Sequence, residues 1–169
     1  MFFVYLGYKI THLKSYNMNE LNYLGITIKV KDGEYSVWEN SDGKPVVRIN
    51  RILASKFIRE FIKKRYPKRD FKYWVQSDIY SGGSSVRVYV SKPNGESIDE
   101  KIYQEIKSFC NALRGGDFDG MIDLYTYRNN VKSEDGIYFS FSTSYIFTSN
   151  KPPYGSKEYD LREQLNLTI

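Results

Sequence analysis

The sequence contains very little cysteine or histidine, and it has no long apolar run. Its one cysteine, Cys110, cannot form a disulfide within the chain. No apolar stretch reaches the roughly 18 residues of a membrane span, and Met1–Tyr8 lacks the basic segment and the cleavage site of a signal peptide. These absences predict an intracellular protein that contacts no membrane, with Met1–Tyr8 as its first strand. A chain of 169 residues can bury the core of one globular domain.

The scarcity of histidine also argues against a nucleophilic hydrolase. Ser84 and Ser85 would need a base, but the sole histidine, His12, lies in the predicted N-terminal strand region. Cys110 borders an apolar helix stripe, and nothing near it in the sequence would lower the pKa of its thiol. We therefore interpret Cys110 as a small core residue and predict no catalytic residue.

Two segments, Ser81–Ser85 and Gly115–Arg128, combine glycines with small hydroxyls or carboxylates. In Gly115–Arg128, the carboxylates Asp117, Asp119 and Asp123 do not match the alternating ligand positions of a calcium loop. The first, Ser81–Ser85, joins two predicted strands and lacks the Gly-Lys-Ser/Thr ending of a phosphate loop. We expect neither a metal nor another cofactor, and we interpret the glycines as a hairpin turn and a helix cap.

Acidic residues are too few for a protein that imitates DNA. The chain has 25 lysines and arginines against 20 acids, which gives a net charge of +5. Between residues 51 and 72, nine cations and two acids give a local net charge of +7. Such a patch can attract a polyanion, although the same pattern also fits a solvated helix face. This basic patch consists of Arg51, Lys56, Arg59, Lys63, Lys64, Arg65, Lys68, Arg69 and Lys72.

Hydrophobic periodicity predicts an α+β fold. Leu24–Val30 alternates like a strand, Asp32–Gly33 is a hairpin signal and Glu34–Trp38 returns, so residues 1–50 predict a β-meander appended to the core. Two helix-strand-strand units follow, and we expect them to form a mainly antiparallel sheet packed by helices. Residues 51–150 would form this domain. Residues 151–169 would form a tail, with a short helix at Lys157–Leu165.

The predicted helices have recognisable end signals. Ile52–Tyr66 has an apolar stripe and stops at Pro67. Ser97 and Glu100 form a capping box before the second helix, which Gly115–Gly116 would end. The predicted strands are Phe71–Ser77, Ser85–Val90 and a last strand that starts at Ile137 and continues to Phe147.

Alternation along these strands separates an apolar face from a face of aromatic and basic residues. Val86, Val88 and Val90 share one face, which places Arg87 and Tyr89 on the other. Aromatic rings interleaved with cations can stack bases and hold phosphates. If helices covered both sides of the sheet, the same aromatic residues would be ordinary core. The residues expected on the polar side are Lys72, Trp74, Arg87, Tyr89, Tyr125, Tyr127 and Arg128.

Several ordered motifs resemble a known family. They comprise the basic helix with Tyr66–Pro67, the Ser77–Ser85 turn segment, the Phe118–Arg128 run, and Phe139–Phe141 with Tyr145–Phe147. Together they resemble the twenty-ninth of the large polyvalent protein-associated domains over residues 52–150. The resemblance implies a protein of phages, plasmids or conjugative elements that acts in the cytoplasm of a bacterial host.

Two kinds of function follow as expectations. The preferred one is a non-enzymatic binding module that engages nucleic acid or a host nucleic-acid-loaded defence complex, for example as a counter-defence inhibitor such as an anti-CRISPR protein. One alternative is a small enzyme of unassigned chemistry, and another is a structural virion or assembly component. The polar residues of the family motifs available to such an enzyme are Ser84, Ser85, Asp119 and Asp123, beside Tyr125 and Tyr127.

Overall fold

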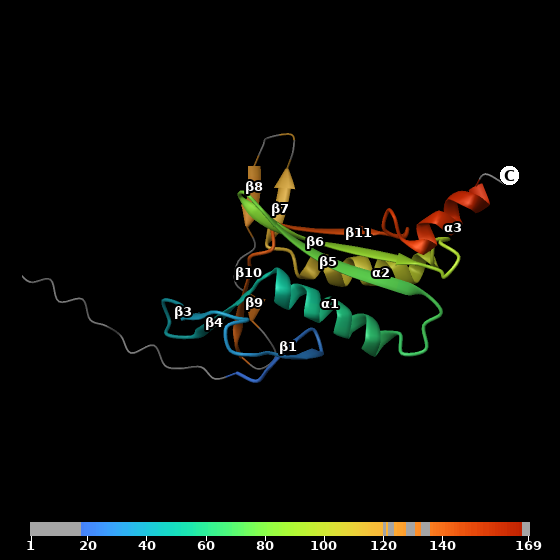
Figure 1. The fold of residues 1–169 in the computed structure, drawn as a ribbon. Helices are drawn as coiled ribbons and strands as arrows, with labels where there is room; N and C mark the ends of the chain where they lie inside the picture. The colour runs from blue at the N-terminus through green and yellow to red at the C-terminus, as the bar shows by residue number, and fades with distance from the viewer. Residues whose placement is uncertain (1–17, 120, 122–123, 128–130, 133–135, 167–169) are drawn as a thin grey trace, which may run out of the picture.

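The computed structural model describes residues 18–119, 121, 124–127, 131–132 and 136–166 (Figure 1). These residues form three helices and eleven strands, and the strands make sheets of two, four, three and two strands. The α+β class predicted from the sequence is confirmed. The expected strand Met1–Tyr8 and the residues His12, Asp123 and Arg128 lie outside the described residues.

The first hairpin turns earlier than the sequence indicates. β1 (Glu20–Tyr23) pairs antiparallel with β2 (Ile26–Lys29) across the turn Leu24–Gly25. Both turn residues have a positive φ, 51° at Leu24 and 72° at Gly25, as in the type I′ turns that suit twisted strands. The predicted hairpin across Asp32–Gly33 is wrong, because the chain turns at Leu24–Gly25, where the glycine favours a turn but the leucine before it is not a typical turn residue.

The four-stranded sheet joins distant parts of the chain. β4 (Pro45–Ile49) runs parallel to β10 (Tyr138–Phe141), whereas neighbouring strands of a meander are antiparallel. Residues 45–49 therefore share a sheet with residues 138–141. The order is β3-β4-β10-β9, formed by β3 (Val37–Glu39), β4 (Pro45–Ile49), β10 (Tyr138–Phe141) and β9 (Val131–Lys132).

The last predicted strand is two strands in different sheets. β10 ends at Phe141, and β11 (Tyr145–Ser149) begins after three intervening residues and pairs with β6 (Gly83–Ser91). Backbone bonds hold the linker in place: the N–H of Ser142 donates to the Ile49 carbonyl at 3.0 Å, and the Thr143 carbonyl accepts from residue 115 at 2.9 Å. These bonds redirect the chain from one sheet into the other.

Helix α1 (Arg51–Arg65) starts one residue earlier than predicted, after the N-cap Asn50, whose side chain accepts two backbone N–H groups. Helix α2 (Glu100–Ala112) is capped in the same way by Asp99. The predicted cap at Ser97 is wrong, because the Ser97 hydroxyl donates to the Asn150 carbonyl at 2.9 Å. A carboxylate one residue before the helix satisfies its first amides instead.

Gly115 does not end α2 as a left-handed cap. The helix is closed at Leu113, and the φ of Gly115 is not positive. A Cβ at Gly115 would lie 2.6 Å from the carbonyl oxygen of Phe141. The glycine is needed because two backbone segments approach closely here.

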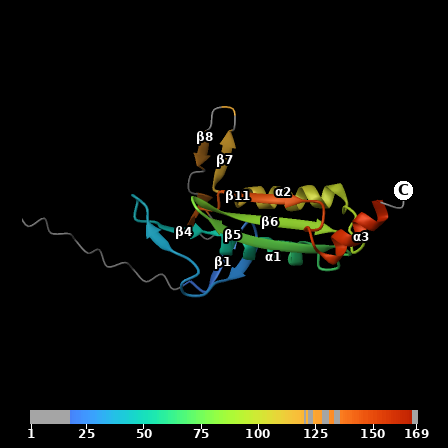
Figure 2. The ribbon, with the colours of Figure 1, turned by 45° about the horizontal axis from the view of Figure 1, so that its top comes forward.

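The three-stranded sheet β11-β6-β5 contains the longest hairpin. β5 (Lys72–Tyr80) and β6 (Gly83–Ser91) pair antiparallel across Ser81–Gly82, where Gly82 has a φ of 90°, in agreement with the predicted glycine turn. In Figure 2 the three strands lie in front of α1 and α2. The face of the sheet toward these helices is apolar and at most 9% exposed, at Val75, Val86, Val88, Val90 and Ile146.

Two further elements flank the sheet. β7 (Gly116–Asp119) and β8 (Leu124–Tyr127) form a separate two-stranded sheet that projects near the β5–β6 turn (Figures 1 and 2). α3 (Lys157–Asn166) spans the short helix predicted in the tail and packs at the opposite end. A Cβ on Gly95 would clash with the Glu158 carbonyl oxygen in the α3 backbone, so this position requires glycine. None of the three helices could cross a membrane, being too short or too polar in the described part of the chain.

Candidate nucleic-acid interface

The face of β11-β6-β5 that points away from α1 and α2 carries aromatic and polar side chains. We call it the open face. Trp74 lies directly opposite Tyr89, and Gln76 lies opposite Arg87. On the other side of β6, Phe147 of β11 is the partner of Arg87. The structure thus brings together four residues predicted for the polar side, Lys72, Trp74, Arg87 and Tyr89.

These aromatic side chains are not core residues. Phe147 is 54% exposed, and Trp74, Tyr89 and Tyr145 are half-buried. The rings of Tyr145 and Phe147 are stacked, with 5.8 Å between their centroids and 8° between their planes. Both helices that contact the sheet centre lie on the opposite face, so the alternative of a sheet covered on both sides does not apply to these residues.

Arg87 and Asp78 form an ion pair at the centre of the open face. The Arg87 guanidinium lies 3.1 Å from the Asp78 carboxylate, and both side chains are about half exposed. An exposed pair of this kind contributes little to stability. It holds the guanidinium beside the aromatic rings, where a flat cation can stack on a base or meet a phosphate.

Helix α3 closes one end of the open face. Lys72 donates to the nearly buried carboxylate of Glu158, and this bond holds the pKa of Glu158 below its ordinary value. Arg69 lies over the ring of Tyr73, 4.9 Å from its centroid. A cleft of about 320 Å³ lies at this end, lined by Arg69, Phe71, Lys72, Tyr73, Trp74 and Glu158.

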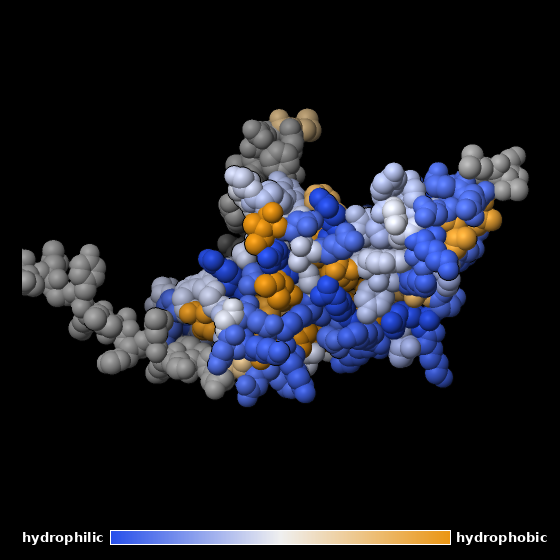
Figure 3. Space-filling view, viewed as in Figure 1, coloured by the Kyte–Doolittle hydropathy of each residue, from blue (hydrophilic) through white to orange (hydrophobic). Residues whose placement is uncertain are grey.

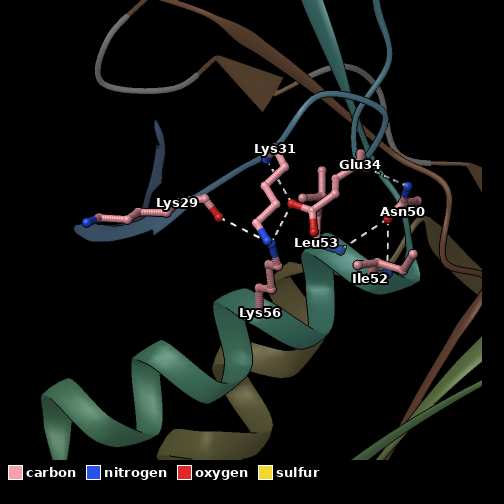
Figure 4. A network of polar contacts seen from close by, with 7 residues as sticks. All are labelled: Lys29, Lys31, Glu34, Asn50, Ile52, Leu53 and Lys56. Atoms are coloured by element: carbon pink, nitrogen blue, oxygen red, sulfur yellow. Dashed lines mark hydrogen bonds and ion pairs between the residues drawn. The ribbon is translucent and has the colours of Figure 1, made fainter. Parts of the chain in front are cut away.

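Several cations of the basic patch are paired with acidic side chains. Lys56 pairs with Glu34 in the network of Figure 4, where the Lys29 carbonyl also accepts from it at 3.3 Å. Arg65 pairs with Glu105 at 3.3 Å. When Glu34, Glu105 and Glu158 are included, nine cations face five acids, and the local net charge falls from +7 to +4.

Other cations of the basic patch form hydrogen bonds, two of them to the backbone of other elements. Arg59 donates to the Val75 carbonyl at 2.7 Å, Lys64 to the Gly25 carbonyl at 2.8 Å, and Lys63 to Glu60 at 2.7 Å. The Tyr66 hydroxyl donates to Glu105, and burial is the main reason why the pKa of Tyr66 rises to about 12. The patch therefore joins α1 to the β1–β2 hairpin, to β5 and to α2.

Two predicted members lie in a different sheet. Tyr125 and Tyr127 belong to β8, whose partners are Phe118 and Gly116 of β7, so they do not extend the sheet of Trp74. Asp119 ends β7. The expectation that all these strands share one polar face is wrong for β8, because β8 pairs with β7 in a separate two-stranded sheet.

Ser84 and Ser85, the predicted serines of the family motifs, lie in β6. Ser85 lies between Asp78 and Tyr145 in the sheet and is 3% exposed, and Ser84 pairs with Ile79. Burial raises the pKa of Cys110 to about 12, which disfavours the nucleophilic thiolate. Within the described ranges, no group of three histidine, cysteine or acidic residues could hold a metal ion.

Alternation in the sequence had already placed Gln76 on the side of Lys72 and Trp74, but it missed two members of the open face, Tyr145 and Phe147. The signal was present, because Tyr145 and Phe147 flank the buried Ile146 in an alternating run. Figure 3 shows that the surface around the β5–β6 end is mainly hydrophilic with separate hydrophobic groups.

Comparison with known proteins places the chain in a family and gives no closer relative. No curated protein and no solved structure matches it. The sequence model described as "Large polyvalent protein associated domain 29" matches residues 49–155, which is more than half of the chain. That match includes α1, all three strands of the open face, α2 and the β7–β8 hairpin. The chain therefore belongs to large polyvalent protein-associated domain family 29, a family of mobile-element modules.

Proposed function

We propose that this protein is a nucleic-acid-binding module of a mobile element, and that it holds a single strand on the open face of β11-β6-β5. The observation that carries the proposal is the juxtaposition of Trp74, Tyr89, Arg87 and Phe147 on three adjacent strands, on the face away from α1 and α2.

Sheet geometry suits a chain of unpaired bases. Neighbouring strands lie about 4.8 Å apart, and side chains of one face repeat about every 6.8 Å along a strand. Trp74 and Tyr89 thus provide one platform, and Phe147 with Tyr145 provides another across β6. Each stacked base contributes on the order of 1–3 kcal/mol, which a duplex cannot supply because its bases are already stacked.

Cations at the edges of this face would hold the phosphates. Arg69 and Lys72 line the cleft next to Trp74, and Arg87 lies between Tyr89 and Phe147 in the sheet plan. Because Lys56, Lys63 and Arg65 of the basic patch are paired with acids, phosphate attraction depends mainly on the residues at the face itself. Salt should therefore weaken binding with a moderate slope.

Mobile elements enter bacteria that defend themselves with nucleic-acid-guided complexes. A module that binds single-stranded nucleic acid would act in the bacterial cytoplasm, either on free nucleic acid or on the strand displaced by such a complex. This role is that of a counter-defence inhibitor, such as an anti-CRISPR protein. Family membership supports the mobile-element setting, and the open face supports the choice of ligand.

The test is fluorescence anisotropy with labelled 12-nucleotide single strands of DNA and RNA and a DNA duplex of equal length, at low salt. We expect single strands to bind more tightly than the duplex. The double variant Trp74→Ala/Tyr89→Ala should weaken single-strand binding by about 10–100-fold. Trp38→Ala is the matched control, because Trp38 is the other of the two tryptophans and lies on β3 in a different sheet. Equal losses in both variants, or undiminished binding by the double variant, would refute the proposal.

A further inference from the structure

The end of β5 is an exposed strand edge. β5 is the outer strand in the order β11-β6-β5, and its last five residues, Gln76–Tyr80, are exposed. Ile79 is 70% exposed although its side chain lies on the helix-facing side of the sheet. The strand therefore extends past the helices that cover its first half.

The polar groups of this edge have a defined direction. Arg59 on α1 donates to the Val75 carbonyl at 2.7 Å, which places that carbonyl on the outer side of β5, away from β6. Because hydrogen-bonding direction alternates along an antiparallel strand, Ser77 and Ile79 also present N–H and C=O outward. Among the described residues, no hydrogen bond to these outward groups of Ser77 or Ile79 is present.

We propose that this edge pairs antiparallel with the same edge of a second copy of the chain, around a two-fold axis at Ser77. In this register Ser77 faces the partner's Ser77, and each Val75 faces the partner's Ile79. Gln76 then lies opposite the partner's Asp78. A register shifted to Asp78 would set two carboxylates directly opposite each other, which is destabilising.

The pairing gives each component of the edge a partner. Ser77 and its symmetry mate exchange two backbone hydrogen bonds, and Ile79 gains an apolar neighbour in place of water. Since the strands run in opposite directions, the helix-covered halves of the two copies lie at opposite ends of the paired region. Uncovered edges of this kind are the ones that natural sheets pair or block.

The dimer extends beyond the proposed function, because it forms without nucleic acid. It would join two open faces into one six-stranded sheet, with Trp74 of one copy opposite the partner's Tyr80. A ligand spanning both copies would then contact twice the number of aromatic platforms. Failure to dimerise would leave single-strand binding by one copy unaffected, so the two ideas fail separately.

The test uses cysteine cross-linking of the full chain without nucleic acid. The native Cys110 is buried, so Ser77→Cys introduces one accessible thiol. Opposite residues of a hydrogen-bonded pair have Cα atoms about 5.5 Å apart, within disulfide range. We expect mild oxidation to give a covalent dimer linked at position 77, and Asp78→Cys, the matched control one residue away, to give little.

Light scattering during size-exclusion chromatography tests the native edge. The wild type should elute as a dimer, and Ile79→Lys should weaken self-association by about tenfold, because two symmetry-related Val75–Ile79 pairs are lost. Ser77→Pro, which removes an outward N–H at an edge where proline is tolerated, should have the same effect. A monomer at all concentrations, equal cross-linking of both cysteine variants, or a dimer unaffected by Ile79→Lys would each overturn the proposal.

Discussion

The two faces of β11-β6-β5 are built from alternate residues of the same strands, yet they have different physical roles. Toward α1 and α2, Val86 and Val88 are at most 1% exposed and belong to the main hydrophobic core. On the opposite face, Arg87 is exposed, Tyr89 is half-buried and Phe147 is 54% exposed. The period of two in a strand thus supplies a core and a candidate binding surface together.

Because of this difference, the aromatic side chains of the open face contribute less to stability than the side chains of the core. Stabilisation by burial scales with the apolar area removed from water, and much of Phe147 remains in water. A polar residue at its position would stabilise the folded chain almost as well. An exposed aromatic residue at this position is what the proposed stacking platform requires.

The largest expected effect comes from placing a charge on the helix-facing side. Val88→Asp would bury an unpaired carboxylate against α1, and the free energy of unfolding should fall by more than about 4 kcal/mol. The neighbouring change Arg87→Asp, one residue away on the open face, should alter it by less than about 1 kcal/mol. Urea unfolding followed by circular dichroism measures both. Similar losses in the two variants would show that the open face is also packed.

The second prediction compares an exposed phenylalanine of the open face with a buried one. Phe147→Ala should leave the free energy of unfolding within about 1 kcal/mol of the wild type, because the ring is largely exposed. It should weaken single-strand binding by about tenfold, because one stacked base is lost. Phe139→Ala, whose ring is fully buried, is the opposite case and should cost about 3–5 kcal/mol of stability. If Phe147→Ala bound nucleic acid normally, β11 would not be part of the interface.

Local sequence patterns were enough to predict the β5 and β6 part of the open face. Alternation assigned Trp74 and Tyr89 to one side, and the turn at Gly82 paired their strands. Phe147 was not assigned to this face because the sequence predicted one strand where the structure has two, β10 and β11, in different sheets. Backbone hydrogen bonds of Ile49 and Gly115 to the segment between these strands redirect the chain. Pairing between distant segments leaves no periodic signal in either segment.

The basic patch shows the same limit. Its cations were visible in the sequence, but the acids that pair with them, Glu34, Glu105 and Glu158, come from three separate elements. Only the fold shows which positive charges are compensated. Likewise, Leu24 has a φ of 51° although leucine is not a typical turn residue, so Gly25 alone did not place the first hairpin in the sequence analysis.

The third prediction separates a cation at the cleft next to Trp74 from a cation of α1 that is paired with an acid. Arg69→Gln, beside Trp74, should weaken single-strand binding by about threefold and lower the slope of log K against log salt by about 0.7. Lys63→Gln should change neither quantity, because Lys63 lies on α1 and is paired with Glu60. A titration at three salt concentrations distinguishes them. Equal effects would assign phosphate binding to the whole basic patch.

The smallest effect concerns the end of the open face that α3 covers. Glu158→Gln removes the charge that pairs with Lys72 and should lower the free energy of unfolding by about 1 kcal/mol at pH 7. Because Lys72 lowers the folded-state pKa of Glu158, this stabilisation is fully present above the ordinary carboxyl pKa of 4.5 and is lost as the pH falls through the folded value. The difference between wild type and variant should therefore shrink below about pH 4.5.

Urea unfolding at pH 7 and at about pH 3.5 measures this difference, and Glu163→Gln, an exposed acid on the same helix, is the control. Glu163→Gln should behave like the wild type at both values. If Glu158→Gln instead lost stability equally at both, packing of α3 and not the charge of Glu158 would hold this end of the sheet. The Lys72 ammonium, released in Glu158→Gln, should also bind a single strand slightly more tightly, because its competing carboxylate is gone.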